Sequence, residues 1–184
     1  WSRRGMMPLT TSLAGKRLGI VGLGRIGHEL ANRARAFKMQ IAYTGRRKQD
    51  VPYVFHERLT DLAANVDVLA LTCPGGPETR HLINASVLEA LGPKAWIINL
   101  ARGSVIDENA LIESLQQRRI AGAALDVFEN EPNIDPRFLE LENVILYPHH
   151  ASGTTETRHA MSQLVVDNLL AHFQGRPLLT PVTI

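Results

Sequence analysis

The sequence predicts an α/β fold in which a parallel sheet carries helices on both faces, a doubly wound arrangement. Three observations predict it. Strand-like and helix-like segments alternate along almost the whole chain, several strands are apolar on both faces, and the first strand runs directly into a glycine-rich turn and a helix. With 184 residues, 45% of them hydrophobic and 21% charged, the chain is long enough for one well-buried domain of ordinary globular composition.

The strands and helices are expected in alternating order. Strands are expected near 17–21, 39–44, 66–72, 95–99, 120–125 and 144–147, with a weaker strand at 52–55. Longer helices are expected near 25–37 and 154–173, and a further helix runs from a cap at Asp107 to about Arg118. Thr60 is expected to cap a short turn of helix, and another short turn of helix at 85–91 is expected to stop at Gly92 and Pro93.

Three glycines follow the first strand in the order G-x-G-x-x-G. The first glycine permits a tight turn, the second leaves room for a pyrophosphate to approach the backbone, and the third lets the helix pack closely on its strand. The first helical N–H groups then face the phosphates. Apolar residues at helical spacing complete the strand–turn–helix context, namely Ile26, Leu30, Ala34 and Phe37. The sequence therefore predicts a Rossmann-type dinucleotide-binding turn made of Gly22, Leu23, Gly24, Arg25, Ile26 and Gly27.

The tip of the second strand indicates which dinucleotide is bound. A dinucleotide fold normally places Asp or Glu there to bind the ribose 2′-OH, but this chain has Thr44 followed by Gly45, Arg46, Arg47 and Lys48. No carboxylate is present to repel a 2′-phosphate, and the guanidinium groups can hold one. Thr44, Arg46 and Arg47 therefore favour NADP, with NAD as the alternative cofactor; a merely solvated basic turn is the competing interpretation.

Charge, hydropathy and cysteine content exclude other classes of partner. The net charge is +2 and the basic residues are scattered apart from 46–48 and 118–119, which argues against a nucleic-acid surface. No apolar run reaches the length of a membrane span and no signal peptide opens the sequence, so no membrane partner is expected. The single cysteine, Cys73, fits a cytoplasmic location, and no Cys/His cluster has metal-ligand spacing.

Three further motifs occur in order along the chain. They are Ile98-Asn-Leu-Ala-Arg-Gly103, Ala124-Leu-Asp-Val-Phe-Glu-Asn-Glu-Pro132 and Tyr147-Pro-His-His-Ala-Ser-Gly153. Together they resemble the D-isomer-specific 2-hydroxyacid dehydrogenases over about residues 12–181. Within that family the chain is most similar to the glyoxylate/hydroxypyruvate reductase branch, on the strength of Tyr43-Thr-Gly-Arg46 and of His149 followed by Ser-Gly.

The resemblance implies three catalytic residues. Arg102 would bind the carboxylate and carbonyl of a 2-oxo acid, which suits a fixed guanidinium. His149 would donate the proton to the carbonyl oxygen, and Glu131 would hold its ring and favour its protonated form. Glu129 competes with Glu131 for this role, and Glu131 is chosen because the family's pattern places the catalytic glutamate directly before proline. His150 stands where an aliphatic residue is expected and competes with His149, which is preferred because it follows Pro148.

The resemblance also implies cofactor contacts beyond the glycine turn. Asp126 would bind the nicotinamide carboxamide, while Cys73, Pro74 and Thr79 would line the adenosine side and the nicotinamide ribose. The full set of expected cofactor contacts outside the first two motifs is Cys73, Pro74, Thr79, Leu100, Ala101, Arg102, Asp126, His149, Ser152 and Gly153.

The expected organisation has three parts. Residues 1–12 read as a linker from an N-terminal substrate lobe that this sequence lacks, 13–153 as the NAD(P)-binding domain, and 154–184 as a C-terminal helix and tail returning toward that lobe. The resemblance implies NADPH-dependent reduction of a small 2-oxo acid of the glyoxylate or hydroxypyruvate type to the D-2-hydroxy acid, by a homodimer in the intact protein. The chain alone is expected to bind cofactor without appreciable turnover. The alternatives are a dinucleotide-sensing regulator similar to corepressors of this fold and an NAD-dependent D-2-hydroxyacid dehydrogenase of another substrate.

Overall fold

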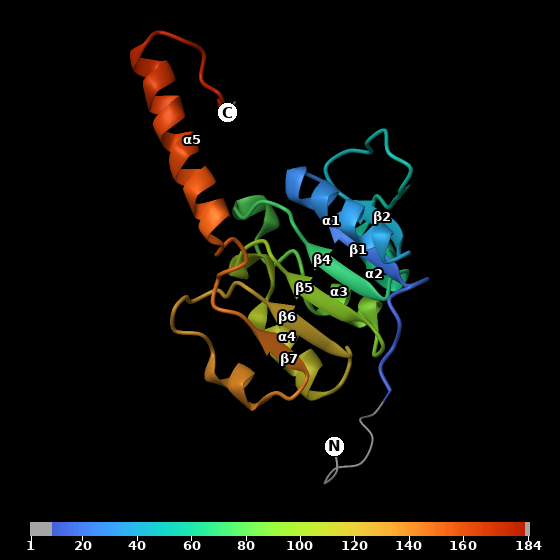
Figure 1. The fold of residues 1–184 in the computed structure, drawn as a ribbon. Helices are drawn as coiled ribbons and strands as arrows, with labels where there is room; N and C mark the ends of the chain where they lie inside the picture. Colours follow the sequence, from blue (N-terminus) through green and yellow to red (C-terminus); the bar gives the residue numbers. More distant parts are fainter. Residues whose placement is uncertain (1–8, 183–184) are drawn as a thin grey trace, which may run out of the picture. The chain divides into compact units, whose positions relative to one another are not determined.

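The first of two structural units contains a seven-stranded parallel sheet (Figure 1). The computed structural model describes residues 9–182, and its two units divide between His149 and His150. The strands are β1 (Arg17–Val21), β2 (Gln40–Thr44), β3 (Val54–Phe55), β4 (Val68–Leu71), β5 (Trp96–Asn99), β6 (Gly122–Leu125) and β7 (Val144–Leu146). The helices of this unit are α1 (Arg25–Ala36), α2 (Leu59–Ala64), α3 (Ala85–Leu91) and α4 (Glu108–Gln116), with 3-10 turns η1 (Pro77–Thr79), η2 (Gly103–Val105) and η3 (Pro136–Glu140). The predicted doubly wound α/β fold is confirmed.

The strand order is β3-β2-β1-β4-β5-β6-β7. Strands β1 to β3 therefore follow one another toward one edge of the sheet, and strands β4 to β7 follow one another toward the other edge. Val21, Leu71 and Asn99 end their strands side by side in the parallel register. Open α/β sheets bind ligands at such a switch point, outside the carboxyl ends of the strands.

Two hydrophobic clusters pack on opposite faces of the sheet. The larger cluster joins the sheet to α2, α3 and α4, with Leu62, Leu88 and Leu111 fully buried. The smaller cluster joins β1 and β2 to α1. On the β5–β7 part of this second face, none of the four described helices of the first unit packs in the hydrophobic clusters, and Trp96 and Ile145 are 38% and 63% exposed.

The buried stripe of α1 differs from the predicted one. The residues that face the sheet are Gly27, Ala31 and Ala34, whereas Ile26 and Phe37 are 62% and 60% exposed. Only small side chains fit where α1 approaches β1 closely, since a Cβ on Gly27 would lie 3.3 Å from Ile20 Cγ2. Of the predicted apolar face, Ala34 is buried and Leu30 is half-buried.

The predicted helix ends are confirmed at most positions and wrong at one. Asp107 caps α4 by accepting a hydrogen bond from Ala110 N, and Gly92 ends α3 with a φ of 78°. Thr60, however, does not cap α2, because the helix begins one residue earlier, at Leu59. The carbonyl of Arg58 already accepts from the N–H groups of Asp61 and Leu62 at 3.2 Å.

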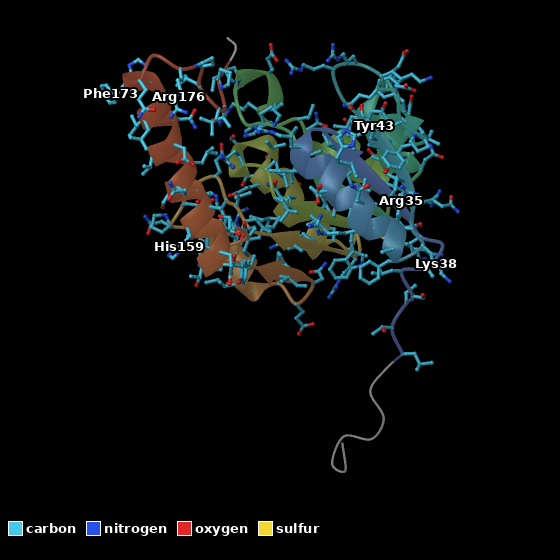
Figure 2. The ribbon with its side chains drawn as sticks, turned by 45° about the horizontal axis from the view of Figure 1, so that its top comes forward. Arg35, Lys38, Tyr43, His159, Phe173 and Arg176 are labelled. Atoms are coloured by element: carbon cyan, nitrogen blue, oxygen red, sulfur yellow. The ribbon has the colours of Figure 1, made fainter. Side chains whose placement is uncertain are left out.

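The second unit begins at His150 and contains α5 (Thr155–Phe173), the short segment before this helix and the tail that follows it. Thr154 caps the helix through Thr157 N, and Asn168 Oδ1 accepts hydrogen bonds from Leu179 N and Thr180 N. The tail therefore folds back along its own helix. Phe173, at the last turn, is 81% exposed (Figure 2). None of the helices in residues 9–182 combines the length and apolarity that a membrane span requires.

Candidate active site

A cleft of about 820 Å³ opens at the carboxyl ends of β1, β4, β5 and β6. The segments that follow these four strands line it, together with the residue before the second unit. The predicted site residues that line the cleft are Gly24, Arg25, Ile26, Cys73, Pro74, Leu100, Ala101, Arg102, Glu131 and His149. The lining residues outside the predicted set are Thr72, Gly75, Gly76, Gly103, Ser104 and Phe128, together with Glu129, which competes with Glu131 in the prediction but is not chosen.

The glycine turn has the geometry that a pyrophosphate cradle needs. Gly22 has a φ of 90°, and a Cβ there would lie 2.7 Å from Cys73 Cα, so only glycine fits. A Cβ on Gly27 would lie 2.6 Å from the Gly22 carbonyl oxygen. Gly24, in contrast, faces open space, with nothing within 4 Å of an added Cβ. The turn is therefore packed tightly from behind and open toward the cleft, as a bound dinucleotide requires.

Thr72 connects the end of β4 to the glycine turn. Its hydroxyl donates to the Gly22 carbonyl at 2.7 Å, and its backbone N–H donates to the Val21 carbonyl at 3.0 Å. The position of this threonine, directly after a buried strand that pairs with β1, is the signal that could have found it.

Asn99 shapes the loop that presents Arg102. The Asn99 side chain is buried at the end of β5, accepts from Ala101 N at 3.0 Å and donates to the Arg102 carbonyl at 3.1 Å. The Arg102 side chain lies against Gly75, where an added Cβ would come within 2.6 Å of Arg102 Cγ. The loop is thus fixed from both sides, and a guanidinium lines the cleft.

Glu131 and His149 form a hydrogen-bonded pair in the cleft. Glu131 Oε2 lies 2.6 Å from His149 Nδ1, and Glu131 Oε1 accepts from Phe128 N at 2.8 Å. Partial burial would raise the pKa of Glu131, but hydrogen bonds from His149 and from the Phe128 N–H outweigh it and hold the pKa below its usual value. The carboxylate is thus charged near neutral pH and fixes the imidazole ring through Nδ1.

Glu129, the other acidic residue of this loop, has different partners. It pairs with Arg80 at 2.8 Å and with His81 Nε2 at 3.4 Å. Its backbone N–H donates to Glu108 Oε1 at 2.7 Å, and burial raises the pKa of Glu108. The geometry therefore separates the two glutamates that the sequence left open to confusion, because Glu131 is the one bonded to His149.

The basic tip, residues 45–48, follows β2 and lies outside the cleft lining. Thr44 is buried, while Arg46, Arg47 and Lys48 are exposed. The Thr44 carbonyl accepts from Gly22 N at 3.0 Å, which joins the base of the tip to the glycine turn. Two arginines and a lysine are therefore presented to solvent beside the first strand of the dinucleotide turn.

The remaining predicted contacts are not among the residues that line the cleft. Gly22, Leu23 and Gly27 form the packed side of the turn, and Asp126 is buried directly after β6. Thr79 donates to the Pro74 carbonyl at 2.8 Å and so braces the loop after β4. Ser152 and Gly153 belong to the second unit, in which Gly153 lies against the His150 ring.

Comparison with known proteins agrees with this geometry. Residues 1–151 match the family profile described as "D-isomer specific 2-hydroxyacid dehydrogenase, NAD binding domain". The chain is 51% identical over 179 residues to the hydroxyphenylpyruvate reductase of Plectranthus scutellarioides, covering 97% of this chain and 57% of that protein. It is 50% identical to a glyoxylate/hydroxypyruvate reductase of Arabidopsis thaliana, covering 98% of this chain and 58% of that protein.

Solved structures show the same likeness. An NADPH-dependent glyoxylate/hydroxypyruvate reductase from Sinorhizobium meliloti, in complex with NADP and malonate, superposes with a TM-score of 0.95 at 49% identity, covering 100% of this chain and 58% of that one. A 2-hydroxyacid dehydrogenase from Ketogulonicigenium vulgare Y25 gives a TM-score of 0.94 at 52% identity with the same coverage. The chain thus spans a little over half the length of the relatives it matches. It belongs to the D-isomer-specific 2-hydroxyacid dehydrogenase family, and its residues 1–151 correspond to that family's NAD-binding domain.

Proposed function

We propose that this chain is the coenzyme-binding part of an NADPH-dependent reductase that converts a small 2-oxo acid, of the glyoxylate or hydroxypyruvate type, to the D-2-hydroxy acid. The observation that carries the proposal is the cleft that brings the glycine turn, Arg102 and the Glu131–His149 pair to one edge of the sheet. The similarity to reductases of these substrates supports the same conclusion.

The side chains of the cleft divide the chemistry between them. Arg102 offers a permanently charged, planar guanidinium, which suits the carboxylate and the carbonyl oxygen of a 2-oxo acid. His149 donates a proton to that carbonyl oxygen as the carbonyl carbon is reduced, and Glu131 holds the ring through Nδ1, which leaves Nε2 for the substrate. A bound nicotinamide supplies the hydride. The product thus gains one hydride at carbon and one proton at oxygen.

The basic tip supports NADP as the cofactor. Arg46 and Arg47 are exposed beside the buried Thr44, and no carboxylate ends β2. Replacing Thr44 by Asp and Arg46 by Ala is expected to reverse the preference from NADPH to NADH, which a fluorescence titration with each cofactor measures. Survival of the NADPH affinity in this double variant would contradict the assignment.

The chain alone is expected to bind cofactor with little turnover. It carries Arg102, Glu131 and His149 but spans only 57–58% of the length of its relatives. Incubation of the 184-residue chain with NADPH and glyoxylate or hydroxypyruvate tests this, because oxidation of NADPH removes the absorbance of its reduced nicotinamide. Steady oxidation of NADPH would overturn the expectation.

The apolar surface of α5 supports a further part of the proposal. Met161, Val165, Leu169 and Phe173 are each at least half exposed on this helix. Burial of such side chains is favourable by roughly 25 cal/mol per Å². We infer that residues 154–184 pack on the substrate lobe of an intact protein, which assembles as a homodimer. The free thiol of Cys73 supports a cytoplasmic location.

A further inference from the structure

Gln49 connects the far end of the basic tip to the glycine turn. Its side chain is half-buried although Lys48 and Asp50 on either side are exposed. The Gln49 side-chain Nε2 donates to the Leu23 carbonyl at 2.8 Å, and Oε1 lies 3.2 Å from His28 Nε2. One side chain therefore contacts both the middle of the G-x-G turn and the first turn of α1.

The backbone of Gln49 is fixed as well. Gln49 N donates to the hydroxyl of Tyr43 at 2.7 Å, and that hydroxyl lies 3.3 Å from the Gln49 carbonyl. Tyr43 is fully buried in β2 and packs on Phe55, with ring centroids 5.2 Å apart. The residue that follows the tip is therefore hydrogen-bonded to a side chain that is packed within the sheet.

Both ends of the basic tip are thus bonded to consecutive residues of the glycine turn. At its start the Thr44 carbonyl accepts from Gly22 N, and at its end the Gln49 amide donates to the Leu23 carbonyl. Because the Gln49 nitrogen is used on Leu23, its oxygen must be the acceptor toward His28, which requires a hydrogen on His28 Nε2. The tip, the turn and the start of α1 form one hydrogen-bonded unit.

We propose that Gln49 is a positioning residue for cofactor selectivity, which holds Arg46 and Arg47 at a fixed place relative to the pyrophosphate turn and thereby strengthens binding of a 2′-phosphate. This inference rests on the NADP binding proposed above. A dinucleotide that reaches the glycine turn presents its 2′-phosphate at a set distance from the pyrophosphate. A tip already held in place loses less conformational freedom when it binds that phosphate. A dinucleotide without the 2′-phosphate gains nothing from this preorganisation.

The test replaces Gln49 with Met, which has similar length and no hydrogen-bonding amide. Isothermal titration of the 184-residue chain with NADP⁺ and NAD⁺ measures both affinities without turnover. Loss of the two side-chain hydrogen bonds is expected to weaken NADP⁺ binding about tenfold. NAD⁺ binding is expected to change less than about twofold. Amide hydrogen exchange is expected to rise in residues 45–51 of the variant. Gln163→Met, which removes an exposed glutamine on α5, is the matched control.

The outcomes separate this inference from the proposed function. If Arg46→Ala with Arg47→Ala leaves NADP⁺ affinity unchanged, NADP recognition by the tip is itself wrong. If that double variant weakens NADP⁺ binding but Gln49→Met does not, the positioning role of Gln49 alone is refuted. Equal weakening of NADP⁺ and NAD⁺ by Gln49→Met would also refute it, because the glutamine would then support the turn in general. His28→Phe provides a second variant that removes one hydrogen bond and leaves the Gln49–Leu23 contact, and a smaller selective loss is expected.

Discussion

Substitution of Gly27 by Ala tests the close packing behind the dinucleotide turn. The new Cβ would lie 2.6 Å from the Gly22 carbonyl oxygen and 3.1 Å from Thr72 Oγ1, whereas an ordinary contact starts at 3.4 Å. The nearest atom belongs to the backbone of the turn, so no side-chain rotation relieves the contact. The start of α1 and the turn must instead move apart by about 0.8 Å at this point.

The expected cost follows from two opposing effects. Overpacking of this kind lowers the free energy of unfolding by about 1–3 kcal/mol, whereas replacing glycine by alanine inside a helix raises it by up to about 1 kcal/mol. A net loss of about 1–2 kcal/mol lowers the melting temperature of a chain of this size by about 2–8 °C. Calorimetry measures the melting temperature, and titration with NADP⁺ measures whether the displaced turn still binds.

Gly24→Ala is the matched control, because a Cβ there meets nothing within 4 Å. Its φ of −87° suits alanine, so the stability loss is expected to stay below about 1 kcal/mol. Dinucleotide affinity is expected to fall at least about tenfold, since the methyl group enters the space of the pyrophosphate. The described turn would be refuted if Gly27→Ala had the same melting temperature as the parent, or if Gly24→Ala bound NADP⁺ as tightly as the parent.

Three further variants test the charges and caps around the sheet. Asp67→Asn is expected to lower the free energy of unfolding by about 1 kcal/mol near pH 7 and by little near pH 2, because Arg17 holds the pKa of Asp67 below its usual value and this stabilisation is lost as the pH falls through the lowered pKa. Equal losses in urea unfolding at both pH values would contradict the pairing. Burial raises the pKa of Glu108, so ionisation of this carboxyl group destabilises the fold as the pH rises. Glu108→Gln, whose amide oxygen can still accept from Glu129 N, is therefore expected to have a higher free energy of unfolding relative to the parent near pH 8 than near pH 4, and the reverse order in urea unfolding would be inconsistent with this. Asn84→Ala removes the cap that accepts from the first turn of α3 and is expected to cost about 1 kcal/mol, or about 2–4 °C in melting temperature, and an unchanged melting temperature would count against the cap.

Local patterns predicted most of the fold. Alternating apolar segments and turn residues identified all seven strands, with ends shifted by one or two residues, and Asp107 and Gly92 mark helix ends through local hydrogen bonding and a positive φ. The apolar stripe of α1 could not be derived from hydrophobicity. The sheet lies so close to this helix that glycine and alanine occupy the buried side, and the larger Ile26 is left at the rim of the cleft.

The site was predictable where it follows strand ends and less so where distant loops meet. The sequence places Arg102 and Cys73 after buried strands, and the structure brings both to one cleft. Gln49 gave no signal, because its partners Leu23 and His28 lie 26 and 21 residues away and a lone glutamine in a loop has no pattern. The catalytic roles of Arg102, Glu131 and His149 stay predictions, and so do the contacts expected from Ser152 and Gly153.

The most direct test of the central claim is the affinity of the unmodified 184-residue chain for NADPH and for NADH, measured by fluorescence titration under one buffer and salt condition. The open face of the glycine turn and the exposed arginines of the basic tip predict that both bind and that NADPH binds at least about tenfold more tightly. Binding of neither cofactor would contradict the dinucleotide site. Equal affinities, or tighter binding of NADH, would contradict recognition of the 2′-phosphate.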